Sequence, residues 1–172
     1  MKSLLVFHAF YPQITYRLVF LDFLTNTNQA QHVLWLLHHL CWTDQWVFER
    51  QDIDGSYPLH LVLNHPCTVQ GSCLPVAREL VKILLQAHPD SARHTMHGRL
   101  PLHMAVENGW PCHDLLLAVF PEALDILDPK TELFPFQTAA RAKEQACALD
   151  VTYELLRANP TLSRALEITR VS

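Results

Sequence analysis

Pairs of histidine and cysteine have the clearest potential for chemistry in this sequence. His38 and Cys41 are three positions apart, so on a helix they would share a face and could bind a metal or form a base–nucleophile pair. Cys112 and His113 are adjacent in the chain. No other histidine or cysteine stands at a spacing that would complete a four-ligand zinc site. We therefore predict no metal and no other cofactor, and expect partly buried thiols and surface imidazoles.

The sequence contains none of the local motifs that usually mark a catalytic centre. There is no G-x-S-x-G, no H-E-x-x-H and no glycine-rich phosphate loop, and the four glycines stand where turns or helix ends are expected. Asp52 and Asp54 lie in an expected turn, where aspartate is common without any catalytic role. We predict that the protein is not an enzyme. A zinc or thiol enzyme stays open as a weaker alternative, which rests only on the eleven histidines and five cysteines.

The composition is that of a globular protein with a weakly acidic surface. The 172 residues are 49% hydrophobic and 17% charged, with a formal net charge of −4. This charge balance provides no attraction to nucleic acid, and no basic stripe accompanies the four tryptophans that could stack on bases. The odd number of irregularly spaced cysteines argues against a disulfide framework. We expect an intracellular location, cytoplasmic or nuclear.

Residues 1–24 are strongly apolar but do not fit a membrane span. A span needs about 20 predominantly apolar residues, and Pro12, Arg17 and Asp22 interrupt this run. Secretion is not expected, because His8 lies within the apolar stretch and no small-x-small cleavage site follows it. We expect this segment to form helices that pack on the rest of the chain. Self-association through the apolar N-terminus stays open as an alternative.

Three segments of the chain repeat one pattern, in which a turn is followed by a helix. They span residues 55–63, 98–106 and 132–140, and each carries a proline at its fourth position. Proline is favoured as the first residue of a helix, because it has no N–H to leave unpaired there. The residues that follow place apolar side chains at i, i+3 and i+4, the spacing of one helix face. Each segment therefore predicts a turn and a short helix.

A second pattern closes each unit. Residues 84–89, 116–121 and 155–160 each begin with two leucines and end with a proline. Since the residue before a proline avoids the helical conformation, each proline predicts the end of a second helix. Pro75 is the expected start of the first of these helices, and Asp150 is the expected N-cap of the last.

Together these two patterns resemble the ankyrin repeat. Residues 98–105, Gly-Arg-Leu-Pro-Leu-His-Met-Ala, match the G-x-T-P-L-H-x-A signature of that family except at the threonine. Residues 55–61 keep the glycine, proline, leucine and histidine, whereas residues 132–139 keep the proline, the apolar residue after it and the alanine. Without the threonine that locks the turn in the family, packing must hold these turns. Its position is taken by Tyr57, Leu100 and Phe134.

The resemblance implies an all-α fold, an ankyrin-like solenoid of stacked helix–loop–helix repeats. About three repeats are expected, over residues 52–93, 94–127 and 128–165, in a region that spans 46–172 and ends in a short tail. Residues 1–45 are expected to form apolar N-terminal helices that act as a degenerate half-repeat or a cap, because terminal repeats are usually atypical.

The resemblance also assigns structural roles to the motif residues. In the family the histidine usually hydrogen-bonds the neighbouring turn, so His60 and His103 are expected to order the stack and not to act as bases or ligands. Gln137 offers similar hydrogen-bonding capacity in the third repeat. The full structural motif set is Gly55, Pro58, His60, Gly98, Pro101, His103 and Pro135.

In ankyrin-like proteins the turns and first helices usually form the binding surface. The positions carried over to this chain mix charged, polar and a few apolar side chains, which is the composition of a protein-binding patch. The alternative is that they are solvated turn residues without a partner. They are Ile53, Asp54, Ser56, Asn64, His65, Met96, His97, Arg99, Glu107, Asn108, Lys130, Thr131, Leu133 and Arg141.

We therefore predict a non-catalytic protein–protein interaction module or scaffold, which binds another protein through its repeat turns and first helices. The main alternative is a structural subunit or fragment of a longer repeat array, motivated by the apolar residues 1–24. Neither nucleic acid nor a membrane is expected as a partner.

Overall fold

The structure, a computed structural model, describes residues 49, 51, 55–67, 74–142 and 148–159. This part of the chain is helical and contains no β-strand, so the prediction of an all-α protein is confirmed for it. None of its helices combines the length and the apolar character that crossing a membrane requires. The predicted N-terminal half-repeat or cap, with His38 and Cys41, lies outside the described residues.

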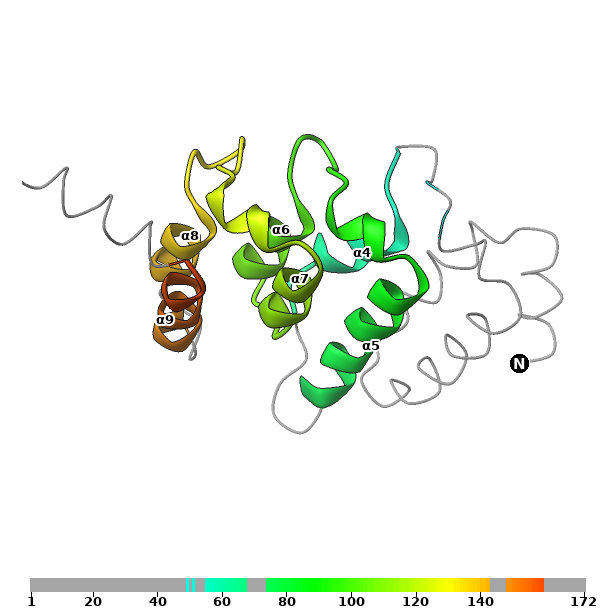
Figure 1. Ribbon diagram of the computed structural model, residues 1–172, viewed down its shortest axis with the longest axis horizontal. Coiled ribbons are helices and arrows are strands. Elements are labelled where there is room, and N and C mark those ends of the chain that lie inside the picture. Colours follow the sequence, from blue (N-terminus) through cyan, green and yellow to red (C-terminus); the bar gives the residue numbers. More distant parts are fainter. Residues whose placement is uncertain (1–48, 50, 52–54, 68–73, 143–147, 160–172) are drawn as a thin grey trace, which may run out of the picture.

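The described α-helices form three consecutive pairs (Figure 1). The pairs are α4 (Pro58–Leu63) with α5 (Leu74–Ala87), α6 (Pro101–Glu107) with α7 (His113–Val119), and α8 (Pro135–Arg141) with α9 (Ala148–Ala158). Two short 3-10 helices follow the second helices of the first two pairs, η4 (Pro89–Ala92) and η5 (Pro121–Asp125).

The first helix of each pair begins at the predicted proline. The residue before each proline is extended, with ψ of 160° at Tyr57, 153° at Leu100 and 156° at Phe134, because a following proline disfavours the helical conformation. The second helices of the first two pairs also end just before the predicted prolines, at Ala87 and Val119.

The predicted N-cap of α9 is wrong. The helix begins at Ala148, so Asp150 lies in its first turn. The carboxylate still stabilises the helix from that position, since the first turn carries the positive end of the helix dipole.

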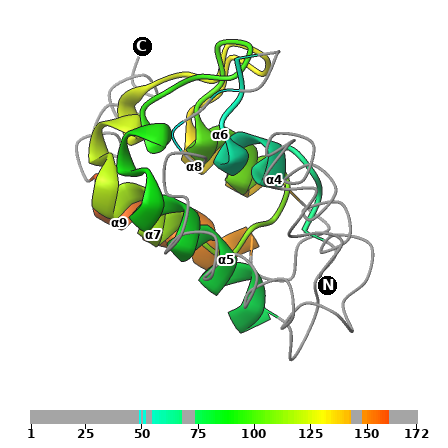
Figure 2. The same ribbon diagram turned by 90° about the vertical axis from the view of Figure 1, so that its right-hand side faces the viewer.

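The helices form two layers (Figures 1 and 2). Helices α4, α6 and α8 lie side by side in one layer, and α5, α7 and α9 lie in the other. Contacts join α4 to α6, α6 to α8 and α5 to α7, and also join the two helices of each pair. The loops before α6 and α8 project on the same side of the molecule (Figure 1). The row of helix pairs therefore presents successive turns along one edge.

Apolar side chains fill the space between the layers. Leu59, Val62 and Leu63 of α4 are all buried, as are the residues at the equivalent positions of α6. Burying one side chain of this size contributes about 1.5–3 kcal/mol. The predicted apolar stripe of α8 is shorter than expected, because Ala139 is buried whereas Ala140 is exposed.

Candidate protein-binding surface

The turn before α6 is a tight hairpin that exposes one side chain at its tip. Met96 and Arg99 exchange two backbone hydrogen bonds, each with an N···O distance of 3.0 Å. The residues between them have positive φ, 52° at His97 and 78° at Gly98, as a two-residue type I′ turn requires. His97 is exposed, whereas Met96 and Arg99 are only 8% exposed. Residues paired across a hairpin point to the same face, and here that face is the interior.

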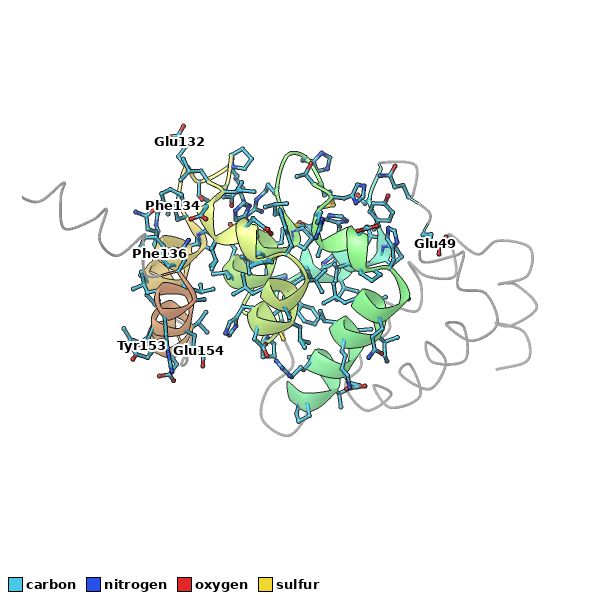
Figure 3. The ribbon with its side chains drawn as sticks, in the orientation of Figure 1. Glu49, Glu132, Phe134, Phe136, Tyr153 and Glu154 are labelled. Carbon is cyan, nitrogen blue, oxygen red and sulfur yellow. The ribbon has the colours of Figure 1, made fainter. Side chains whose placement is uncertain are left out.

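Asp128 organises the turn before α8. Its backbone carbonyl accepts the N–H of Glu132 at 2.8 Å, and its own N–H donates to the carbonyl of Leu133 at 3.0 Å. Its Oδ1 accepts the N–H of Lys130 at 3.0 Å. Glu132 has a φ of 56°, at the position where the other two repeats have glycine. The Glu132 side chain points away from the helices at the tip of the turn (Figure 3).

A buried ion cluster joins these two turns to α6. The Arg99 guanidinium donates to both carboxylate oxygens of Asp128 at 2.6 to 3.1 Å, and its Nη2 also donates to Glu107 at 2.6 Å. Lys130 Nζ donates to the other Glu107 oxygen at 3.0 Å. Asp128 is fully buried. The cluster therefore acts as a structural link between the second and third repeats.

The carboxylates of this cluster are held ionised by their partners. Burial by itself would raise the pKa of Asp128, but the hydrogen bonds from Arg99 and from the Lys130 N–H outweigh burial and lower that pKa. The pKa of Glu107 is also lowered, since Lys130 and Arg99 outweigh its burial. Burial opposes the charge of Arg99, yet the two carboxylates raise its pKa. The cluster stays charged at neutral pH and is not poised to transfer a proton.

His60 and His103 use both ring nitrogens inside the fold. In each, Nδ1 accepts the backbone N–H three residues earlier, at 3.2 Å for His60 and 3.3 Å for His103. Nε2 of His60 donates to the carbonyl of His94 at 2.8 Å, and Nε2 of His103 donates to that of Ile126 at 2.9 Å. Both imidazoles are buried, and burial lowers the pKa of His103. These rings order the turns and are not exposed to act as bases or ligands.

In the third repeat Gln137 takes the place of the histidine, and aromatic rings pack at two of the positions where the family has threonine. Oε1 of Gln137 accepts the N–H of Phe134 at 2.9 Å. The Phe134 ring stacks on Phe136, with ring centroids 6.1 Å apart. The Tyr57 ring packs edge-on against His94 with a centroid distance of 4.9 Å. All three turns are therefore held by the hydrogen bond to residue three of the helix, and ring packing adds to it at Tyr57 and Phe134.

Cys112 and His113 do not form a reactive pair. Cys112 is fully buried, and burial raises the pKa of its thiol, so the nucleophilic thiolate is disfavoured. His113 Nε2 donates to Glu154 at 2.5 Å. Among the residues that the structure describes, no three histidine, cysteine or acidic side chains lie close enough together to hold a metal ion.

The predicted partner-binding residues fall into four groups. The exposed ones are Asn64, His65, His97, Lys130 and Arg141. The half-buried ones are Glu107, Asn108, Thr131 and Leu133. Ser56, Met96 and Arg99 are buried, so their expected place on the surface is wrong. Ser56 occupies the position equivalent to Arg99 and is covered in the same way. Ile53 and Asp54 lie outside the described residues.

Asn108 belongs to the junction between the first two repeats. Its side-chain amide donates to the carbonyl of Leu63 at 2.7 Å, and its own carbonyl accepts the N–H of Cys67 at 2.8 Å. Trp110 Nε1 donates to the carbonyl of His65 at 2.8 Å. The loop between α6 and α7 thereby satisfies backbone groups at the end of α4, which would otherwise need water or a cap.

Six polar side chains of the turns and first helices form two neighbouring sets. We call His97, Lys130 and Glu132 the turn edge. We call Asn64, Glu107 and Arg141, which occupy one repeated position of the first helices, the helix-face column. The salt bridge between Lys130 and Glu107 joins the two sets. Along the helix-face column the side chain changes from neutral to acidic to basic, so this surface can recognise a protein through hydrogen bonds and ion pairs.

Asp128 and Glu132 were outside the predicted surface set, for different reasons. Asp128 stands seven residues before Pro135, and the equivalent residue of the second repeat is His94. Comparing the repeats therefore does not predict a buried carboxylate at position 128. Glu132 aligns with Gly98. Because glycine favours the left-handed conformation, this alignment could have predicted that Glu132 has positive φ and lies at the tip of its turn.

Comparison of the chain with protein-family models, with curated proteins and with solved structures finds no match.

Proposed function

We propose that this chain is a divergent ankyrin-type array that binds another protein through the turn edge and the helix-face column, without catalysis. One observation carries the proposal. Three polar side chains of the repeat motifs, His60, His103 and Arg99, are buried in internal hydrogen bonds. The turn tips, and Asn64 and Arg141 at the repeated helix position, instead carry exposed polar side chains. In this proposal the protein acts inside the cell, in the cytoplasm or nucleus, where its thiols stay reduced.

The arrangement of the helix pairs supports the ankyrin-type part of the proposal. Each first helix begins at a proline and each is preceded by a turn that the third helical residue hydrogen-bonds, through His60, His103 and Gln137. Packing one helix pair on the next makes a continuous core and leaves an extended surface of turns and helix faces, which is how repeat proteins usually bind partners.

A structural subunit of a longer array is a second candidate function, and the outer face of α9 favours it. Leu149 and Tyr153 lie one turn apart and are 83% and 66% exposed. Tyr153 projects away from the other helices at the far end of the row (Figure 3). Since the end of a repeat array needs a polar outer face for solubility, these side chains suit packing against a neighbouring repeat.

Affinity purification with quantitative mass spectrometry tests the proposed binding surface. The bait is the full chain, compared with a turn-edge variant that carries His97→Gly, Lys130→Ala and Glu132→Gly. Glycine is tolerated at both positive-φ positions, so the turns keep their backbone. We expect a specific partner whose recovery falls about tenfold or more in the variant, which corresponds to about 1.4 kcal/mol or more of lost binding free energy.

The matched control alters three residues of α5, with Glu79→Ala at a half-buried site and Lys82→Ala and Gln86→Ala at exposed sites. Both variants remove one acidic and one basic side chain, so their net charge stays equal. Circular dichroism melts should match those of the intact chain for both. Partners that are recovered equally with all three baits would contradict the proposed surface.

A further inference from the structure

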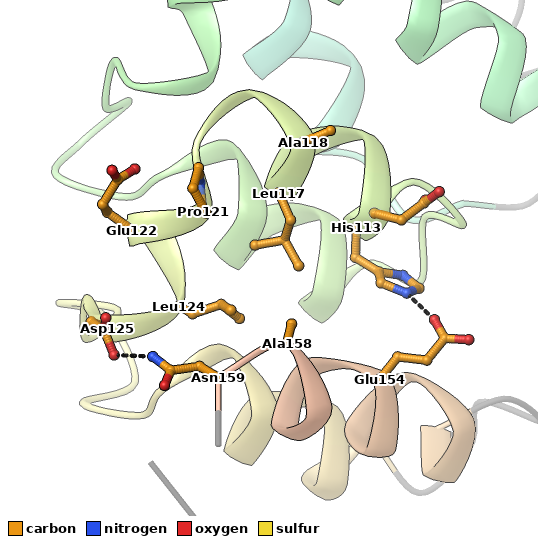
Figure 4. A pocket seen from close by; sticks show the side chains of 11 residues that line it. His113, Leu117, Ala118, Pro121, Glu122, Leu124, Asp125, Glu154, Ala158 and Asn159 are labelled. Carbon is orange, nitrogen blue, oxygen red and sulfur yellow. Dashed lines mark hydrogen bonds and ion pairs between the residues drawn. The ribbon is translucent and has the colours of Figure 1, made fainter. Parts of the chain in front are cut away.

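A groove lies between the second and third helix pairs, on the side of α5, α7 and α9 (Figure 4). Helix α7 and η5 form one wall, and α9 forms the other. The groove has a volume of about 530 Å³, within the range of about 300–1,000 Å³ found for ligand sites. Side-chain contacts bridge both ends, from His113 to Glu154 at 2.5 Å and from Asn159 to Asp125 at 2.6 Å.

Short side chains leave this space open. Leu117, Ala118 and Leu124 line the groove from one side, and Ala158 faces them from α9 (Figure 4). Ala158 is exposed, although Ala87, at the equivalent position of α5, is buried. The apolar lining therefore offers a place for a side chain of leucine size that the described residues do not supply.

The groove is acidic. Carboxylates of Asp114, Glu122, Asp125 and Glu154 line it, and no lysine or arginine is among its lining residues. Asp114 is paired with Arg78 and Glu154 with His113. Glu122 and Asp125 have no ion pair within the described part of the chain, and both are exposed. An apolar space with these carboxylates at its rim complements a cationic partner that also carries an apolar side chain.

We propose that this groove binds a short segment of a protein partner in which one or two apolar side chains are flanked by lysine or arginine. The apolar side chains occupy the space beside Leu117 and Ala158, and the cations pair with Glu122 and Asp125. This site lies on the second-helix layer and is separate from the turn edge, so its existence does not depend on the proposed function above.

Selection of peptides from a random dodecapeptide library on phage, against the full chain, tests the proposal. Enriched peptides are then synthesised with a fluorescent label, and their binding is measured by anisotropy. We expect enriched peptides to carry two or more basic residues around a leucine, isoleucine, methionine or phenylalanine. Ala158→Trp, which fills the groove without changing charge, should raise Kd about tenfold or more. Glu122→Gln with Asp125→Asn should have a similar effect.

Two matched controls separate the groove from general effects. Gln86→Trp adds the same side chain at an exposed site of α5, and Glu79→Gln with Asp90→Asn removes the same charge elsewhere. Both should leave Kd within about twofold of the intact chain, and so should the turn-edge variant. A loss of binding in the turn-edge variant alone would place the peptide on the other surface and overturn this proposal while leaving the proposed function standing.

Three further results would also overturn the proposal. One is the enrichment of peptides without basic residues, or of none at all. Another is binding that Ala158→Trp leaves unchanged. The last is concentration-dependent self-association in sedimentation that Ala158→Trp abolishes, because the occupant would then be a second copy of this chain.

Discussion

At the start of α6, the imidazole of His103 provides an acceptor and a donor that the neighbouring backbone needs. The Leu100 N–H and the Ile126 carbonyl are satisfied by the two ring nitrogens, and an unpaired buried backbone group would cost about 1–3 kcal/mol. This geometry requires a neutral ring with the proton on Nε2. Protonation of Nδ1 would place two donors against each other.

The buried His103 should make stability depend on pH in a defined window. Its pKa is lowered below the ordinary 6.5, because burial disfavours the charged ring. The unfolded chain then binds a proton at a pH where the native protein does not, so stability falls as pH drops below about 6.5 and levels off under the native pKa. Urea unfolding at pH 7 and pH 5 should show a smaller pH effect for His103→Gln than for the intact chain.

His103→Gln should also lower the free energy of unfolding by about 1–2 kcal/mol at pH 7. Glutamine can replace the acceptor contact of the ring but not both of its contacts. Gln137 makes only the acceptor contact at the equivalent place. His65→Gln, at an exposed site, is the control and should keep the pH effect of the intact chain. Parallel pH curves for the intact chain and His103→Gln would refute the assignment.

Sequence reasoning succeeded at this residue and failed at others nearby. The histidine lies in a motif shared by two repeats, and the resemblance of that motif to the ankyrin repeat implies its hydrogen-bonding role. The burial of Met96 and Arg99 cannot be inferred in this way, because it depends on which face of a two-residue hairpin meets the interior. A polar residue in a turn is ordinarily expected to be exposed. Arg99 is buried because its guanidinium pairs with the buried carboxylate of Asp128.

At the scale of elements, the pair of Arg99 and Asp128 fastens one turn to the next. Arg99→Leu should destabilise the protein by about 3–5 kcal/mol, because it leaves a buried carboxylate without its partner. In the double variant Arg99→Leu with Asp128→Asn, the free energy of unfolding should fall by much less than the sum of the two single effects. Asparagine at position 128 can still accept the Lys130 N–H. Urea unfolding of the four proteins at pH 7 gives the coupling free energy as a double-mutant cycle.

Additive single effects would contradict a direct coupling between these two side chains. Lys130→Gln is a suitable control, because its partner Glu107 is only half-buried and Lys130 is exposed. An exposed ion pair of that kind is worth about 1 kcal/mol or less.

Helix ends were predictable wherever a proline marks them, and less so elsewhere. The prolines that begin α4, α6 and α8, and those that follow α5 and α7, mark helix ends as expected. The start of α9 has no such marker, and the predicted N-cap, Asp150, is the third residue of the helix. The 3-10 helices that begin at Pro89 and Pro121 were not predicted, because a proline that ends one helix can also open the next short turn.

At the scale of the molecule, the two junctions between the described helix pairs differ in how they are built. The first is supported in both layers, by α4 with α6 and by α5 with α7. At the second, α6 packs on α8, while the groove separates the facing walls of α7 and α9. The third pair is therefore held chiefly on one side.

Hydrogen exchange should reveal this asymmetry. Leu84 of α5 and Leu155 of α9 occupy equivalent positions and are both buried, so their amides form a matched comparison. We expect the amide of Leu155 to exchange about tenfold faster or more, because local opening of the third pair breaks fewer contacts. Exchange measured by NMR or mass spectrometry checks this. Equal rates would mean that all three pairs open as one unit.

The overall plan of helix pairs followed from the repeat, but the specific contacts between repeats did not. Each repeat shows where its own helices begin and which faces are apolar. Contacts such as Asn108 with Leu63, or Arg99 with Asp128, join residues far apart in the chain. They differ from one junction to the next, so alignment of the repeats cannot disclose them.

Because the two junctions rely on different side chains, the units of this chain are not interchangeable. In a tandem copy of residues 94–127, Arg99 of the first copy would meet the equivalent of Asp128, which in the second copy is His94. Arg99 would keep its contact with Glu107 but lose its fully buried partner, and breaking such a buried ion pair costs about 3 kcal/mol or more. A protein lengthened by duplicating this unit would therefore be less stable, unless an acidic residue arose at the new boundary to pair with Arg99.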